Sequence, residues 1–215
     1  MGIKKGEFIE LNYIGRVKEN NQIFDLTEEK IAKENNIFNP NIKYHPVIIC
    51  IGEGDVLKGL DEQLIGKEIN QRYTIDVKAE KAFGKRNAEL IKLVPQKRFT
   101  EQDIRPFPGL QINFGGAIGT VKIVSGGRIL VDFNHPLAGK ELSYEIEIER
   151  IIKDNKEIIN GFLEMYTGIK DDKLEATADK VTIHNEIPNE LKKFIEENLK
   201  KRLPKLKKIE FKGKV

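Results

Sequence analysis

The stretch from Gly52 to Gly66 contains the residues whose types and spacing best support binding chemistry. It follows an apolar run, its glycines allow a sharp turn, and Asp55 stands where a helix N-cap belongs. The first N–H groups of a helix have no acceptor inside it, so Val56 and Leu57 would offer donors beside an apolar face. That combination suits a ligand with a carbonyl oxygen next to an apolar ring. A strand, turn and helix that only build the core would give the same pattern.

Other side chains with reactive chemistry are scattered. The three histidines, His45, His135 and His184, are isolated, and no pair has the spacing of metal ligands. The single cysteine, Cys50, lies in an apolar run, which indicates a buried structural thiol and not a nucleophile. We therefore expect no metal and no cofactor.

The composition bounds the class of protein. The chain has 215 residues, of which 39% are hydrophobic and 33% charged, and its net charge is +3. This balance argues against wholesale binding of nucleic acid, and the Lys-rich run at 200–214 is interpreted as a solvated basic face. We find no segment long enough to span a membrane and no apolar core of a signal peptide, so we expect a cytoplasmic protein without membrane partners.

Alternating apolar residues predict the strands that would position the 52–66 stretch. Residues 7–17, 73–77 and 142–149 alternate with period two, and 47–51 form a buried apolar run. Leu57, Leu60 and Leu64 form one apolar stripe of a short helix that Gly66 ends. The predicted fold class is α+β, with a curved antiparallel β-sheet wrapped on a short helix.

Two further regions have sequence patterns that differ from those of the predicted sheet. Residues 86–133 contain three short strands with glycine hairpin signals, which predict a small β domain inserted into the first domain. Residues 153–215 predict a C-terminal domain of helices and strands, with a helix beginning near Pro188. The first domain would then be discontinuous, comprising 1–85 and 134–152.

The chain resembles the FKBP-type peptidyl-prolyl cis/trans isomerases, in particular the long, SlyD-like archaeal and bacterial form. The resemblance rests on Tyr13, on Phe24-Asp25, on the 52–60 stretch and on Ala82-Phe83-Gly84. The inserted region, which ends in 134–139 (Asn-His-Pro-Leu-Ala-Gly), is similar to the family's insert-in-flap domain. The C-terminal region is similar to the extra domain of the long archaeal form.

The resemblance implies an isomerase pocket and assigns its residues. The expected pocket residues are Tyr13, Phe24, Asp25, Val56, Leu57, Leu60, Phe83 and Tyr144. In this family an aspartate pairs with a tyrosine hydroxyl, so Asp25 is expected to pair with Tyr13. Two positions depart from the family pattern: Leu60 replaces a frequent tryptophan and Phe83 a frequent tyrosine. Most of these residues would also serve in an ordinary core.

The expected function is rotation of X-Pro bonds in folding polypeptides, combined with chaperone activity. A small β insert buries little core, so Phe114, Ile118 and Leu130 are expected to bind unfolded clients. The alternative is a holdase-type chaperone with little isomerase activity. The C-terminal region carries a helix stripe (Leu191, Phe194, Ile195 and Leu199) and strand residues Ile209 and Phe211. These surfaces would fold back on each other, dock on the first domain or form a homodimer, which we favour.

Overall fold

The structure, a computed structural model, describes residues 2–171 and 173–213. It forms two compact units. The first comprises Met1–Lys78 and Glu141–Val215, and the second comprises Ala79–Lys140. The second unit contains the predicted insert at 86–133, so the chain leaves the first unit once and returns to it. The further division of the first unit into two domains remains a prediction.

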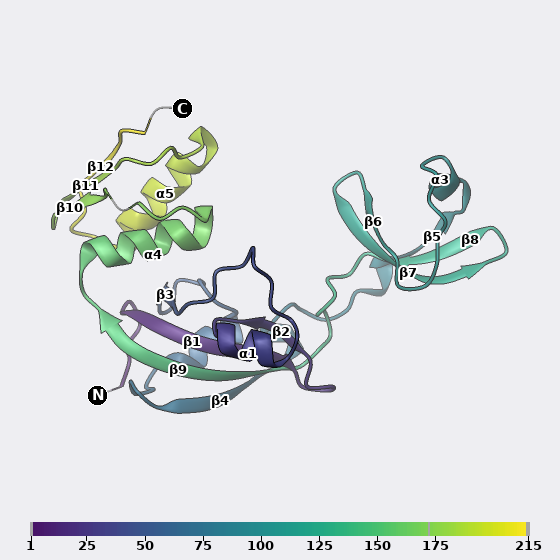
Figure 1. The fold of residues 1–215 in the computed structure, drawn as a ribbon, viewed down its shortest axis with the longest axis horizontal. Helices are drawn as coiled ribbons and strands as arrows, with labels where there is room; N and C mark the ends of the chain where they lie inside the picture. Colours follow the sequence, from purple (N-terminus) through teal and green to yellow (C-terminus); the bar gives the residue numbers. More distant parts are fainter. Residues whose placement is uncertain (1, 172, 214–215) are drawn as a thin grey trace. The chain divides into compact units, whose positions relative to one another are not determined.

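The first unit is built on a five-stranded antiparallel sheet (Figure 1). Its strand order is β2 (Ile23–Leu26), β1 (Phe8–Val17), β9 (Leu142–Ile152) and β4 (Arg72–Val77), and β3 (Val47–Cys50) also pairs with β1. The period-two patterns therefore identify β1, β4 and β9, and the apolar run at 47–51 identifies β3. The long pair β1 and β9 runs through its centre, because their alternating apolar residues bury one face.

Two short helices accompany this sheet. Helix α2 (Lys58–Leu64) packs beside β4, with Leu60 and Leu64 buried, and Gly66 ends the turn after it with a positive φ of 84°. Helix α1 (Glu29–Glu34) follows β2 and buries only Ala32 among its residues. The predicted stripe is thus correct at Leu60 and Leu64, whereas Leu57 is the N-cap residue and only partly buried.

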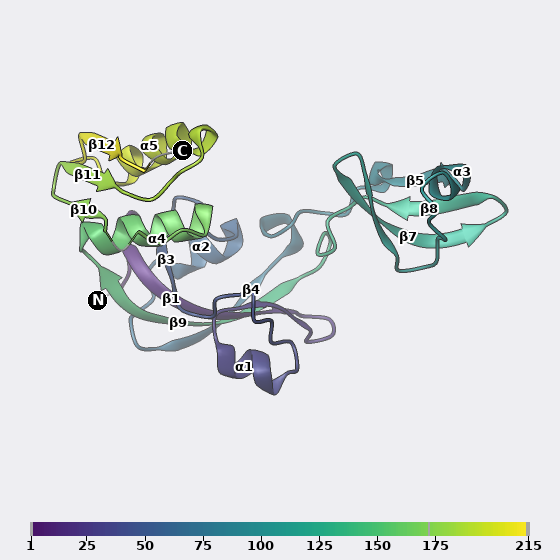
Figure 2. The same cartoon turned by 45° about the horizontal axis from the view of Figure 1, so that its top comes forward.

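The C-terminal segment, residues 153–215, places two helices on a three-stranded sheet (Figures 1 and 2). Helix α4 (Asn155–Thr167) begins where the Asp154 carboxylate accepts the Glu157 N–H at 2.9 Å, and it packs against β3. Helix α5 (Asn189–Arg202) follows Pro188. The strands are β10 (Glu175–Ala176), β11 (Lys180–Ile183) and β12 (Lys208–Phe211), with β11 and β12 parallel.

The apolar surfaces of this segment have partners within the chain. Ile195 and Leu199 of α5 are fully buried, and Ile209 and Phe211 pack against the same core. Phe194 remains 37% exposed. The helix thus folds back on its own strands and α4 packs on β3, which are two of the three expected arrangements, and the homodimer stays a prediction.

The second unit contains a four-stranded antiparallel sheet in the order β5 (Ile91–Pro95), β8 (Arg128–Asp132), β7 (Ala117–Ser125) and β6 (Gln111–Phe114). Helix α3 (Lys97–Thr100) supplies Phe99 to a core that also holds Ile112, Val121, Ile129 and Val131. Short 3-10 turns, η1 (Ala79–Lys81) and η2 (Ala88–Leu90), precede β5. The prediction of three strands was incomplete, since β5 adds a fourth on the edge beside β8.

Asn134 joins the two chain segments at the base of the inserted sheet. Its side-chain oxygen accepts the Asn87 N–H at 2.8 Å, and its amide donates to the Asn87 carbonyl at 2.9 Å. The amide also donates to Asp132, which pairs with Arg86. Asn134, the first residue of the 134–139 segment, thus links the two chain segments at the base of the insert.

Among the described helices, none combines the length and the apolar character that crossing a bilayer requires.

Candidate active site

Three aromatic rings from neighbouring strands form one wall of the candidate site. The Tyr144 ring lies 5.9 Å from that of Tyr13 and 5.8 Å from that of Phe24, both in edge-on geometry. Gly15 lies opposite Tyr144 on β9 and opposite Asp25 on β2. A Cβ atom at Gly15 would lie 2.7 Å from the Phe24 ring and 3.0 Å from the Tyr144 ring. Glycine is therefore needed for these rings to meet.

Asp25 provides a polar anchor beside this wall. The Tyr13 hydroxyl donates a hydrogen bond to an Asp25 carboxylate oxygen at 2.9 Å, as the resemblance implied. Burial and the neighbouring Asp25 raise the pKa of Tyr13 well above its ordinary value, and burial likewise raises that of Tyr144. Both hydroxyl groups therefore remain protonated near neutral pH and can act as hydrogen-bond donors.

The turn before α2 supplies the predicted backbone donors. Gly52 and Gly54 have positive φ values of 84° and 77°. The buried Asp61 carboxylate accepts their N–H groups, at 2.8 Å from Gly52 and 3.4 Å from Gly54. Within the described residues, neither the Val56 nor the Leu57 N–H has an acceptor. These two amides are thus available to an incoming carbonyl oxygen.

Asp55 does not cap α2, so that part of the prediction was wrong. The helix has Leu57 at its N-cap, without a side-chain cap. The Asp55 carboxylate instead accepts the Cys50 N–H at 2.8 Å and the Tyr166 hydroxyl at 2.7 Å. It also pairs with Arg202 at 2.6 Å, and the two side chains are only 4% and 2% exposed. The C-terminal segment is thereby bonded to the turn that carries the free amides.

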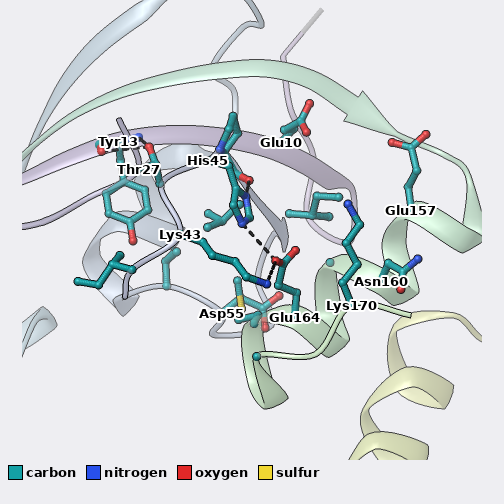
Figure 3. Close-up of a pocket in the computed structure, with 18 of the residues that line it drawn as sticks. Glu10, Tyr13, Thr27, Lys43, His45, Asp55, Glu157, Asn160, Glu164 and Lys170 are labelled. Carbon is teal, nitrogen blue, oxygen red and sulfur yellow. Dashed lines mark hydrogen bonds and ion pairs between the residues drawn. The ribbon is translucent and has the colours of Figure 1, made fainter. Parts of the chain in front are cut away.

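A cavity of about 790 Å³ opens beside these residues (Figure 3). Tyr13, Asp25 and Val56 line it on the side of the sheet and the turn. Asn160, Glu164 and Met165 of α4 line it on the side of the C-terminal segment. Its volume lies in the range of small-molecule pockets, roughly 300–1,000 Å³. It accommodates more than one proline ring.

The predicted site residues are only partly brought together. Tyr13, Asp25 and Val56 line the cavity, and Phe24 and Tyr144 form the ring cluster behind Tyr13. Leu60 is fully buried within the core, and Leu57 follows Val56 at the turn. The eighth residue, Phe83, belongs to the second unit, where its ring stacks on that of His135 at 4.2 Å. The roles of all eight residues in catalysis remain proposals.

Sequence reasoning missed the wall provided by α4. The Oε1 atom of Glu164 lies 3.3 Å from Lys43 Nζ and 3.3 Å from His45 Nε2 (Figure 3). Both partners lie in the loop before β3. Nothing in the spacing of residues 155–167 distinguishes a residue that lines a cavity from one that faces solvent. The sequence therefore carried no signal for this contribution.

The remaining histidines do not gather into a metal site. His135 stacks on Phe83, and His184 lies 3.6 Å from Glu175. Among the residues that the structure describes, no group of three or more His, Cys, Asp or Glu side chains has metal-binding geometry.

Comparison with known proteins identifies the family. The model for FKBP-type peptidyl-prolyl cis-trans isomerases matches residues 2–100. A short-type peptidyl-prolyl cis-trans isomerase from Methanocaldococcus jannaschii is 34% identical over 149 residues, which are 69% of this chain and 94% of that protein. The chain belongs to the FKBP-type peptidyl-prolyl cis-trans isomerases. It is thus an enzyme of that class, and the family resemblance is confirmed.

Further comparisons place this isomerase among the SlyD-like members. The model described as "FKBP26, IF domain" matches residues 92–137, which lie inside the second unit. The isomerase SlyD of Vibrio cholerae is 24% identical over 155 residues, covering 70% of this chain and 77% of that protein. The FKBP-type 16 kDa isomerase of Escherichia coli is 28% identical over 111 residues, covering 49% and 74%. The mixed fold with antiparallel sheets agrees with an FKBP fold plus an insert.

Proposed function

We propose that this isomerase rotates X-Pro bonds of folding polypeptides in the cavity beside Tyr13, Asp25 and Val56, while the insert captures the client. The observation that carries the catalytic part is the pair of unengaged N–H groups at Val56 and Leu57, of which Val56 lines the same cavity as Tyr13. A carbonyl acceptor and an apolar ring are the two features that an X-Pro unit presents together.

The reaction requires no nucleophile. Rotation about the X-Pro amide breaks its resonance and faces a barrier of roughly 18–20 kcal/mol. An apolar enclosure favours the twisted amide, whose dipole is smaller than that of the planar form. The Leu57 N–H would hold the carbonyl oxygen of the client while the proline ring rests against the Tyr13 ring, on which the Tyr144 ring packs edge-on. Asp25 fixes the Tyr13 ring through its hydrogen bond.

Isomerisation of a Leu-Pro tetrapeptide tests the catalytic part, because a peptide this short gains nothing from being held. We expect the full chain to accelerate it, and Asp25→Ala and Tyr144→Ala each to lower kcat/KM by about tenfold or more. Circular dichroism controls for folding. If both variants retain full turnover, Asp25 and Tyr144 do not belong to the site. If the full chain itself fails on the tetrapeptide but prevents aggregation, the alternative of a holdase with little isomerase activity takes over.

An exposed apolar face of the insert supports the capture of clients. Leu93 on β5 lies opposite Leu130 on β8, which in turn lies opposite Ile123 on β7. Residues that pair in this way share one face of a sheet. Leu93 is 62% and Ile123 55% exposed, and Ile118 on the β6–β7 hairpin is 63% exposed. Of the predicted client-binding residues, Ile118 and Leu130 fit this role better than Phe114, which packs into the insert's core.

Replacing residues 86–133 with a short loop tests capture. We expect the shortened isomerase to retain activity on the tetrapeptide and to lose most of its activity on a refolding protein limited by proline isomerisation. Ile123→Asp should reproduce part of this loss, since the side chain is exposed and its replacement spares the insert's core. An equal loss on both substrates would make the insert part of the catalytic fold.

Self-association through residues 153–215 remains a proposal, with Phe194 as its exposed apolar residue. Light scattering of the full chain at several concentrations tests it. A protein that stays monomeric at tens of micromolar would exclude the homodimer.

A further inference from the structure

The cavity continues well beyond the part that a proline would occupy. Its lining passes from Tyr13 and Val56 along the loop before β3 to α4 and to Lys170 beyond α4. Figure 3 shows Tyr13 on one side of the view and Glu157 and Lys170 on the other, with the contacts of Glu164 between them. The C-terminal segment thus forms a wall of the same space that the Tyr13 ring lines.

This wall is fixed in place by close packing and by a buried ion pair. A Cβ atom on Gly161 would lie 2.6 Å from Cβ of Ile48, so α4 approaches β3 as closely as a glycine permits. Arg202 and Tyr166 both bond to Asp55, one residue before the free Val56 N–H. A client therefore meets a preformed surface and not a loosely attached domain.

The extended part combines apolar side chains with charged ones, among them Arg150, Glu157 and Lys170. Ile42, which is 52% exposed, Pro46 and Met165 all line it. The carboxylate of Glu164 is occupied by Lys43 and His45, each at 3.3 Å, so it does not present an unpaired charge. Methionine is unbranched and adapts to ligands of different shape. The three apolar side chains therefore offer a place for an apolar side chain of the client, without requiring one specific shape.

We propose that α4 and the loop before β3 form a client subsite that holds a bulky apolar side chain two or more residues from the proline. The occupant is an extended segment of the same polypeptide whose X-Pro bond lies in the pocket, because the two spaces are one cavity. This inference rests on the proposed function. It gives the C-terminal segment a direct part in choosing substrates.

Peptides of two lengths test the subsite with the full chain. A Leu-Pro tetrapeptide is compared with octapeptides extended by leucines on either the N-terminal or the C-terminal side, and with octapeptides extended by Ser and Gly. Rates are measured by NMR exchange spectroscopy. We expect kcat/KM for one leucine-extended octapeptide to exceed that of the tetrapeptide by about fivefold, the factor for burying roughly half of an apolar side chain. The Ser-Gly peptides should show no such gain.

Variants then locate the preference. Met165→Glu and Ile42→Glu should each lower the ratio of kcat/KM for the leucine-extended octapeptide to kcat/KM for the tetrapeptide to about one. The reason is that a carboxylate disfavours an apolar neighbour. Ile69→Glu is the matched control, since Ile69 is 40% exposed and outside the lining of the cavity, and it should keep the ratio. Ile42 lies in an exposed loop, so its variant remains informative if Met165→Glu fails to fold.

Two outcomes would overturn the subsite. One is equal kcat/KM for the tetrapeptide and both leucine-extended peptides, and the other is a preference that survives both variants. If the tetrapeptide is not turned over at all, the catalytic proposal fails separately. Fluorescence anisotropy of a labelled leucine-extended peptide, with the same three variants, then decides the subsite by binding alone.

Discussion

Removing Arg202 would show how strongly the C-terminal segment is bonded to the catalytic turn. In Arg202→Met the Asp55 carboxylate, only 4% exposed, loses its cationic partner at 2.6 Å. Breaking a buried ion pair in this way costs about 3–5 kcal/mol, because the remaining charge is left without water or a counter-ion. Asp55 keeps the Tyr166 hydroxyl and the Cys50 N–H as donors. We therefore expect the lower end of that range, about 3 kcal/mol.

Thermal and urea unfolding, followed by circular dichroism, measure this loss. For a chain of this length, about 3 kcal/mol corresponds to a fall in Tm of about 6–12 °C. Adding Asp55→Asn to Arg202→Met should recover at least about 1 kcal/mol, because it removes the stranded charge. Arg72→Met is the control: Arg72 pairs with Glu147 at 2.9 Å but is 82% exposed, so its loss should leave Tm unchanged within error.

Either of two results would refute this reasoning. A loss below about 1 kcal/mol for Arg202→Met would mean that water reaches Asp55. An equal loss for Arg72→Met would mean that burial does not distinguish the two pairs.

Three other measurements follow from the geometry. Burial raises the pKa of Cys50 to about 12, so its thiolate is scarce at pH 8. Iodoacetamide should therefore label Cys50 only in urea, and rapid labelling of the native chain would contradict its burial. Burial and the neighbouring Asp25 raise the pKa of Tyr13 above its ordinary value of 10.0, so kcat/KM on the tetrapeptide should be equal at pH 7 and pH 10.5. A decline centred near pH 10 would mean that the pKa is not raised. Gly15→Ala places a methyl group 2.7 Å from the Phe24 ring and should lower kcat/KM by about tenfold, whereas an unchanged rate would mean that the aromatic wall can shift at no cost.

Local patterns in the sequence were sufficient for the main sheet and for the family. The period-two alternation of 142–149 identifies β9, because one face of an antiparallel strand is buried and the other is not. Short motifs such as Phe24-Asp25 and Ala82-Phe83-Gly84 carried the resemblance that the comparisons confirm. The same reasoning missed β5, since its sequence Ile-Lys-Leu-Val-Pro ends in proline and leaves exposed apolar residues on an edge strand.

The sequence by itself determined β1, β4 and β9 through their alternation, and the family resemblance that it carries implied the pairing of Tyr13 with Asp25. Only the tertiary structure decided the partner of Asp55. The Asp55 carboxylate could form either an N-cap hydrogen bond or a buried ion pair. It pairs with Arg202, which lies 147 residues away from it in the sequence. Likewise, the helical pattern of 155–167 predicts an apolar face but not the surface it meets. Docking against β3 makes Glu164 and Met165 a wall of the cavity, because side chains distant in sequence are brought together only by packing.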